Sequence, residues 1–190
     1  MKTLVLVLAL ISGPAFADTA TYSIVTLPSP AEQMDGVMRI LPNPMMTPGV
    51  VRPEITFANL CPKFVDPAAN GVQGTEQYRN VPTARAASVY AEYGLSGDHH
   101  GYCSGPRGCE IDHLISIELG GANDPGNLWP QPYSGTMWTA EAKDDLENKL
   151  HTLVCARTIT LVQAQTAIRT NWINAYKTYI GPAPVEKVKH

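Results

Sequence analysis

The chain has 190 residues, of which 44% are hydrophobic and 16% are charged, and its formal net charge is −3 at pH 7. This length suits one domain with a core of its own. The small excess of acidic residues argues against a sequence-independent coat for nucleic acid, which needs a basic surface. It leaves room for an enzyme that meets phosphate groups through a metal ion.

Residues 1–17 have the three parts of a secretory signal. Lys2 gives a positive start, an apolar run extends from Leu4 to Ile11, and Ala15 and Ala17 form a cleavage pattern of small residues. The apolar run is shorter than the roughly 20 residues that a membrane-spanning helix needs. We therefore expect cleavage after Ala17 and a secreted or periplasmic mature chain with no attachment to the membrane.

Residues 18–56 are expected to form a proline-rich N-terminal arm. Between positions 28 and 53 the prolines are denser than a helix or a central strand tolerates. The arm would therefore be extended, and it would lie on the domain or link it to its surroundings. Residues 57–181 then form the domain itself, and residues 182–190 form a C-terminal tail.

The chain contains four cysteines, and in an exported protein cysteines form disulfides more often than metal clusters. Cys103 and Cys109 flank the turn-rich segment SGPRG, which favours a local bridge and leaves Cys61 to pair with Cys155. The rival interpretation is a zinc site whose ligands come from the segment DHHGYCSGPRGC, namely His99, His100, Cys103 and Cys109.

Apolar periodicity predicts three helices and one hairpin. The first helix begins at Pro82 and ends at Gly94, the second covers 139–155, and the third begins at Thr160 with a capping box. A strand is expected over 109–119, where isoleucines alternate with polar residues, and a second strand over NLWPQP, 127–132. Turn formers in GGANDPG separate the two strands. The fold class is therefore α+β, a mainly helical single domain with a hairpin.

Asp112 and His113 stand side by side in the first expected strand, and Asn127 opens the second. Hydrolysis of a phosphodiester needs a base for water, a cation for the charge on phosphate, and a group that holds the base in one tautomer. His113 can be the base because its ordinary pKa lies near neutrality. Asp112 offers a hard oxygen to a divalent ion, and the side chain or the backbone of Asn127 can orient the imidazole across the hairpin. These residues therefore fit a nuclease.

The segment IDHLISIELGGANDPGNLWP resembles the His-Asn-His (HNH) nuclease motif, whose usual form is Val-Asp-His-Ile-x-Pro-Leu, a Gly-rich loop, then Asn-Leu. More narrowly, the chain is similar to a group of exported bacterial HNH-like proteins over most of 41–180. The similar segments are LPNPMMTPGVV, YGL, DHLISIELGG, NLWPQPY, KDDLENKLHTLVC and AQTAIRTNWINAY. The resemblance implies a ββα-metal motif with His113 as general base, Asp112 as metal ligand and Asn127 as orienting residue.

The third position of the family motif is a histidine or asparagine on the helix that completes the metal site, and the helix over 139–155 has no clear counterpart. His151 and Asn148 lie well along this helix. Asp144 and Glu147 lie nearer its start and belong to the similar segment, so we expect them to join Asp112 as ligands. The expected ion is Mg²⁺, with Mn²⁺ or Zn²⁺ as alternatives.

Two functions of different classes follow from these observations. The first is a monomeric, exported, metal-dependent endonuclease that hydrolyses DNA or RNA, with no protein partner visible. The second is a secreted binding or structural module that keeps the ββα frame without chemistry. In that case Asp112 pairs with a nearby Lys or Arg, and His113 is a satisfied core histidine. Trp129 and Trp138 are expected to anchor the core rather than to stack on bases.

Overall fold

The computed structural model describes residues 40–61, 75, 78–95 and 108–184. The expected signal sequence, the first part of the arm, and the residues His99, His100 and Cys103 lie outside the described residues. Within the described ranges, no helix combines the length and the apolar character that crossing a bilayer requires.

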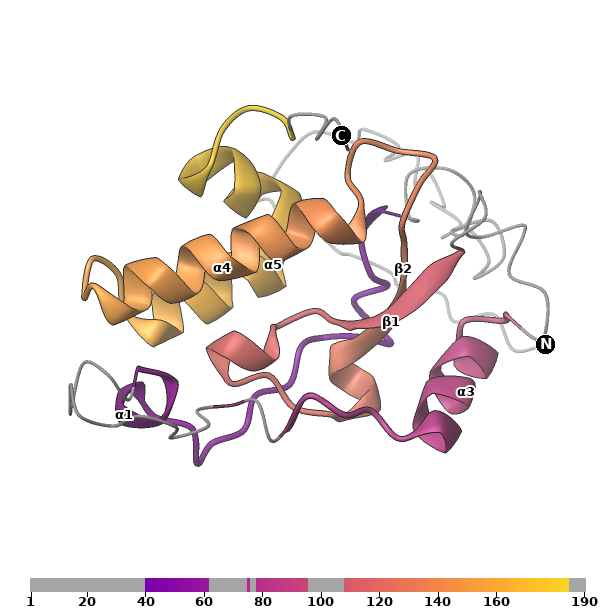
Figure 1. Ribbon diagram of the computed structural model, residues 1–190. Coiled ribbons are helices and arrows are strands. Elements are labelled where there is room, and N and C mark those ends of the chain that lie inside the picture. The colour runs from indigo at the N-terminus through magenta and orange to yellow at the C-terminus, as the bar shows by residue number, and fades with distance from the viewer. Residues whose placement is uncertain (1–39, 62–74, 76–77, 96–107, 185–190) are drawn as a thin grey trace, which may run out of the picture.

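The fold class is α+β, as expected, with a small antiparallel sheet and helices around it (Figure 1). The helices are α1 (Phe57–Leu60), α3 (Thr83–Glu92), α4 (Ala140–Cys155) and α5 (Leu161–Tyr179). The strands β1 (Cys109–His113) and β2 (Leu128–Pro132) pair Cys109 with Pro132 and His113 with Leu128. Two short 3-10 turns, η4 (Ile117–Leu119) and η5 (Pro125–Asn127), lie in the connection between the strands.

The first strand is shorter than the sequence predicts, because the strand pairing ends at His113 rather than at residue 119. The backbone N–H of Leu114 still donates to the carbonyl of Asn127, at 2.8 Å. The next residue, Ile115, bonds to the side chain of Asn127 instead of to a strand, and the chain then enters η4. Alternation of isoleucines correctly indicated burial here, but the burial is achieved in a turn.

The two long helices begin where the sequence predicts. The hydroxyl of Thr139 accepts a hydrogen bond from the N–H of Ala142 at 3.3 Å and caps α4. Thr160 and Gln163 form the expected capping box at the start of α5. Asn171 interrupts α5 with an extended backbone, and its side-chain oxygen accepts from the N–H of Asn174, so the helix restarts there.

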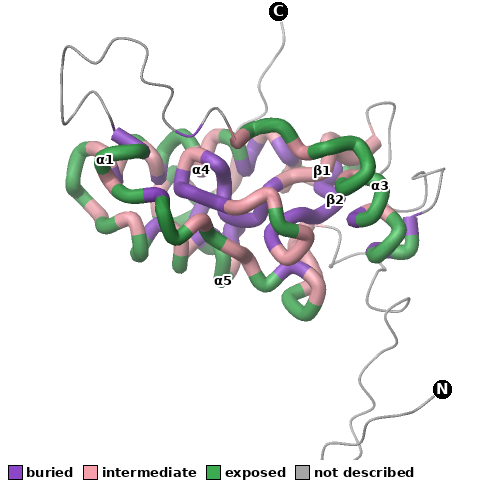
Figure 2. The backbone as a smooth tube through the Cα atoms, turned by 90° about the horizontal axis from the view of Figure 1, so that it is seen from below, coloured by how far each residue is buried: buried purple, intermediate pink, exposed green. Residues whose placement is uncertain are grey.

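The core has two parts. The larger part packs α4 against α5 and includes Leu146, Leu150, Ile168 and Trp172; the smaller part joins α3 to the hairpin. All five residues of β2 are buried, whereas in β1 only His113 is buried and the other four residues are partly exposed (Figure 2). Trp129 is fully buried in the smaller part, as a core anchor must be.

The described end of the N-terminal arm, residues 40–56, lies against the connection between β1 and β2. The N–H groups of Gly49 and Arg52 donate to the carbonyls of Gly126 and Gly120, both at 2.8 Å. The hydroxyl of Thr47 donates to the carbonyl of Leu128 at 2.9 Å and is buried. This part of the arm is therefore built into the domain, on the side of the hairpin connection.

The predicted disulfide between Cys61 and Cys155 is confirmed, with Cα atoms 5.5 Å apart. It joins the end of α1 to the end of α4. Cys109 is also disulfide-bonded. The expected partner Cys103, and with it the rival zinc site that includes His99 and His100, lies outside the described residues.

Candidate functional site

His113 lies at the end of β1 and is buried, with 8% of its surface exposed. Its Nε2 lies 2.6 Å from Oδ1 of Asn123, a residue of the hairpin connection. The Nδ2 of Asn123 donates to the carbonyls of Tyr78 at 2.9 Å and Asn80 at 2.8 Å. Burial lowers the pKa of His113, against the opposing effects of the Asn123 hydrogen bond and the Asp112 charge. The imidazole is therefore held neutral and in a fixed position.

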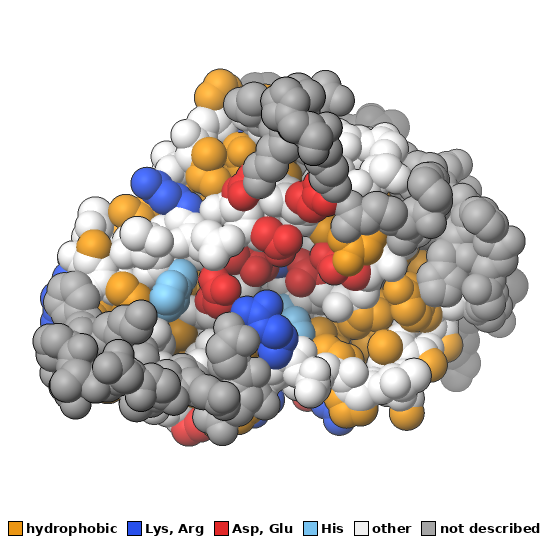
Figure 3. Space-filling model, viewed as in Figure 1, with side chains coloured by type: hydrophobic (Ala, Val, Ile, Leu, Met, Phe, Trp, Pro, Cys, Tyr) orange, Lys and Arg blue, Asp and Glu red, His pale blue; other side chains and the backbone are white. Residues whose placement is uncertain are grey.

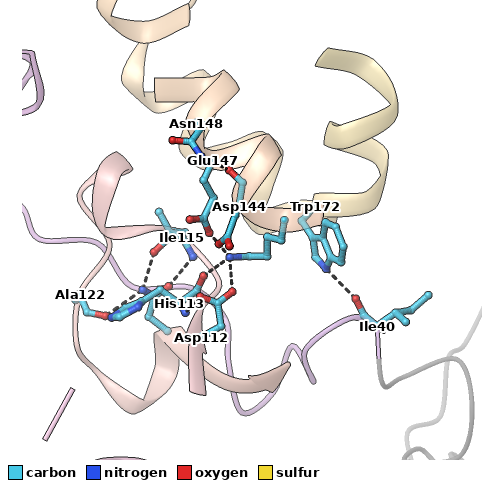
Figure 4. Close-up of polar contacts among 11 residues, drawn as sticks. Ile40, Asp112, His113, Ile115, Ala122, Asp144, Glu147, Asn148 and Trp172 are labelled. Atoms are coloured by element: carbon cyan, nitrogen blue, oxygen red, sulfur yellow. Dashed lines mark hydrogen bonds and ion pairs between the residues drawn. The ribbon is translucent and has the colours of Figure 1, made fainter. Parts of the chain in front are cut away.

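Lys143 on α4 has a fully buried side chain. Figure 4 shows Asp112 and His113 from β1 below Asp144 and Glu147 from α4, and the ammonium of Lys143 bonds to groups of both elements. Nζ donates to Oδ2 of Asp112 at 2.7 Å, to the carbonyl oxygen of His113 at 2.6 Å, and to the carboxylate of Glu147. Asp112 uses its other oxygen to accept from the N–H of His113 at 2.7 Å. The ammonium therefore occupies the space between two of the carboxylates that the sequence proposed as metal ligands.

Carboxylates outnumber the ammonium in this cluster, which contains Glu110, Asp112, Asp144 and Glu147. Burial raises the pKa of Glu147 to about 8, with repulsion from Asp112 adding to it and attraction to Lys143 opposing it. Burial followed by the Asp112 charge raises the pKa of Glu110 to about 7, and both causes also raise the pKa of Asp144. Burial alone would lower the pKa of Lys143, but Asp112 and Glu147 outweigh it and raise that pKa.

The acidic side chains gather in the middle of the face shown in Figure 3, beside Lys or Arg side chains and a histidine. The cluster therefore carries an excess of negative charge that a single ammonium group does not balance. Hard oxygen ligands and uncompensated negative charge are what a Mg²⁺ ion requires, so the donor chemistry fits the expected metal. The position of Lys143 opposes such an ion, because its ammonium already binds Asp112 and Glu147.

The structure brings Asp112 and Glu147 together around one ammonium, whereas Asp144 is more exposed and approaches the cluster from outside. Among the residues described, the group of three metal-binding side chains with ligand atoms within 4.8 Å of one another is Cys61, His151 and Cys155. The two cysteines of this group are joined in a disulfide, so their sulfurs are not thiolate ligands. The three expected carboxylate ligands do not form such a group.

The side chain of Asn127 bonds to backbone groups and not to the imidazole of His113, and its expected role as orienting residue stays a prediction. Asn127 is fully buried, and its Oδ1 accepts from the N–H groups of Ile115 at 2.9 Å and Val50 at 3.4 Å. Its Nδ2 donates to the carbonyls of Ile115 at 2.9 Å and Ala122 at 3.0 Å. All four hydrogen-bonding positions of the amide are therefore used on the backbone of the connection and the arm, and the imidazole meets Asn123 instead.

Sequence reasoning missed both Lys143 and Asn123. Lys143 stands three residues before Leu146 and seven before Leu150, so it lies on the buried face of the helix, and Glu147 follows it at i+4. That spacing could have indicated a buried ion pair. Asn123 sits in the segment GGANDPG, where an asparagine is an ordinary turn former, and nothing in the sequence distinguishes it.

No protein-family model, no curated protein and no solved structure matches this chain. What the described residues offer chemically is a neutral buried imidazole, an acidic cluster and one buried ammonium, all within a strand–loop–strand–helix unit.

Proposed function

We propose that this chain is an exported, metal-dependent HNH-type endonuclease that hydrolyses phosphodiester bonds in DNA or RNA. The observation that supports the proposal most is the position of His113 at the end of β1, beside Asp112 and in front of α4. A β-hairpin followed by a helix, with the histidine at the end of the first strand, is the order that a ββα-metal motif requires. The imidazole is neutral at working pH, as a general base must be.

The acidic cluster beside His113 opposes the approach of a phosphate group. Four carboxylates and one ammonium would repel a phosphodiester unless further positive charge is supplied. A divalent ion such as Mg²⁺, Mn²⁺ or Zn²⁺ held near Asp112, with Asp144 or Glu147, would supply that charge and stabilise the leaving oxygen. In this mechanism His113 takes the proton from water, and Asp112 divides its oxygens between the backbone of His113 and the cation position.

A second function, a secreted binding or structural module without chemistry, is favoured by one observation. The ammonium of Lys143 satisfies Asp112, Glu147 and the carbonyl of His113 together, which ties β1 to α4 with no need for an ion. Removing one partner from such a buried network leaves an uncompensated charge and is strongly destabilising. In this case Asp112 and Lys143 are a structural pair, and His113 completes the core.

A nicking assay on supercoiled plasmid, with a structured RNA in parallel, separates the two functions. The wild-type chain should cleave with Mg²⁺, Mn²⁺ or Zn²⁺, lose activity in excess EDTA, and recover it on addition of metal. His113→Ala should reduce cleavage per folded molecule by roughly 10²–10⁴-fold, the usual effect of a positioned base.

The matched control is His151→Ala, because His151 lies on α4 and donates to the carbonyl of Leu60, away from Asp112. Its cleavage per folded molecule should match the wild type, and melting curves give the folded fraction of each variant. Absence of cleavage with every metal and both substrates would favour the non-catalytic module instead. Equal cleavage rates for the two variants would rule out His113 as the general base.

A further inference from the structure

We propose that Asn123 is a positioning residue that fixes His113 in the Nε2–H tautomer and leaves Nδ1 as the basic nitrogen. The tautomer is a property of the folded chain and does not depend on catalysis. Its consequence for cleavage, that Nδ1 is the atom that accepts the proton from water, rests on the proposed function.

The orientation of the Asn123 amide is determined by its other partners. Its Nδ2 lies 2.9 Å from the carbonyl oxygen of Tyr78 and 2.8 Å from that of Asn80. Carbonyl oxygens only accept hydrogen bonds, and an amide nitrogen has two hydrogens to give. A flipped amide would place Oδ1 against both carbonyl oxygens, so Nδ2 must face them and Oδ1 must face His113.

The tautomer of His113 follows from that orientation. Oδ1 of Asn123 can only accept, and it lies 2.6 Å from Nε2 of His113, so Nε2 carries the hydrogen and donates it. A neutral imidazole has one N–H, which leaves Nδ1 with a lone pair. Within the described part of the chain, the hydrogen bonds of His113 involve its backbone and Nε2, so Nδ1 remains available as an acceptor.

Asn123 holds this position because it joins two distant segments. Tyr78 and Asn80 precede α3 and are separated from Asn123 by more than 40 residues. The guanidinium of Arg85, on α3, also donates to the backbone carbonyl of Asn123. The side-chain amide of Asn123 is therefore held by the segment before α3, which lies outside the hairpin. Through its hydrogen bond to Nε2, Asn123 can fix the orientation of the imidazole without contacting a substrate.

Nuclear magnetic resonance on the full chain labelled with ¹⁵N-histidine tests the proposal without any cleavage assay. Long-range ¹H–¹⁵N correlations assign the tautomer, and His113→Gln identifies the signals. The wild-type chain should give the Nε2–H form, with a slowly exchanging Nε2–H proton close to the side-chain amide of Asn123. An Nδ1–H form would overturn the proposal, and this readout needs no variant of Asn123.

Three variants then attribute the effect to Asn123. In Asn123→Ala the Nε2–H proton should exchange with water roughly tenfold faster, because its acceptor is gone. Asn123→Asp keeps an acceptor oxygen for Nε2 but loses the two hydrogens that bond to the carbonyls of Tyr78 and Asn80, so its protection should fall between that of the wild type and that of Asn123→Ala. The control Asn148→Ala removes an exposed asparagine that bonds to the carbonyl of Asp144 on α4, and it should leave the signal unchanged.

Unchanged protection in Asn123→Ala would overturn the proposal, as would equal losses in Asn123→Ala and Asn148→Ala. If the chain proves to be no nuclease, the tautomer and exchange results keep their meaning. Failure of the proposed function and failure of this inference are therefore distinguishable.

Discussion

The ammonium of Lys143 affects the protonation of the carboxylates around it. One ammonium balances one carboxylate, and both Asp112 and Glu147 contact it. Burial and the charge of Asp112 raise the pKa of Glu147 to about 8 and that of Glu110 to about 7, so bound protons neutralise part of the remaining negative charge at neutral pH. A divalent ion would compete with those protons and with Lys143 for the same oxygens, so metal binding here should be weak and exchangeable.

Glu110 should make the stability of the chain depend on pH. Burial and the Asp112 charge raise its pKa in the folded chain to about 7, from an ordinary value of 4.5, while the hydroxyl of Tyr133 bonds to its carboxylate and opposes the shift. The folded chain therefore binds more protons than the unfolded chain between these pH values. The contribution of Glu110 to stability is fully present below pH 4.5 and is lost as the pH rises through 7.

Glu110→Gln removes this dependence and keeps an acceptor for Tyr133. The variant should unfold at a higher urea concentration than the wild type at pH 8, and the gap should close as the pH falls to 4.5. Urea midpoints across this pH range provide the measurement. Glu54→Gln, at an exposed glutamate paired with Arg52, serves as the control for loss of a surface charge. A gap of constant size at every pH would contradict the assignment.

Among the helices and strands, the sequence predicted those features that depend on residues close together in the chain. The helix over 139–155 and the capping box at Thr160 depend on residues within one or two turns, and they are confirmed. The end of β1 was predicted wrongly because it depends on hydrogen bonds between Ile115 and Asn127, which follows it by twelve residues. The candidate site divides in the same way. Adjacency placed Asp112 beside His113, whereas Asn123 depends on a contact with Tyr78 that no spacing encodes.

The connection between β1 and β2 requires glycine at position 121. A Cβ atom there would lie 1.7 Å from the carbonyl oxygen of Ile115 and 2.8 Å from Nδ2 of Asn127. The first of these is backbone and cannot move aside, so Gly121→Ala must distort the connection and break hydrogen bonds of Asn127. We expect a loss of about 3 kcal/mol or more in the free energy of unfolding.

Gly94→Ala is the matched control, because Gly94 has a φ of +73° but no atom within 4 Å of its added Cβ. It tests backbone strain without a clash and should cost about 1–2 kcal/mol. Urea unfolding of both variants provides the comparison. If the Gly121→Ala chain were as stable as the Gly94→Ala chain, the backbone between β1 and β2 would have to move to make room for the added Cβ. The close approach of residue 121 to Ile115 and Asn127 would then not determine where β1 ends.

At the scale of the whole molecule, the candidate site lies where the two parts of the core meet. Leu114 packs in the smaller part with α3, and the next residue, Ile115, packs in the larger part with α4 and α5. His113 directly precedes this division, and Lys143 reaches its carbonyl from the helix. The relative position of the two parts therefore fixes the distance between the imidazole and the carboxylates of α4. A bond that holds α4 in place therefore supports the site even if it does not contact the site residues.

The disulfide between Cys61 and Cys155 is such a bond. It closes a loop of 94 residues in sequence, which includes α3, the hairpin and α4. In the chain-entropy model a loop of this length stabilises the folded state by about 4–5 kcal/mol, because the bridge restricts the unfolded chain. Cys61 is buried beside α4, and His151 donates to the neighbouring carbonyl of Leu60, so these contacts should keep α1 against α4 when the bridge is removed.

The double variant Cys61→Ser, Cys155→Ser should therefore fold to the same structure but unfold at a much lower urea concentration. Its loss of stability should approach the entropic value and should exceed that of Gly94→Ala. Cys109 is bridged separately, so a reducing agent applied to the wild type removes more than this one crosslink, and the double variant isolates it. The difference between the wild type and the double variant then reports on the bridge between Cys61 and Cys155. The effect of reductant on the double variant reports on the bridge of Cys109. Equal midpoints for the wild type and the double variant, both without reductant, would show that α1 and α4 are held together by packing alone.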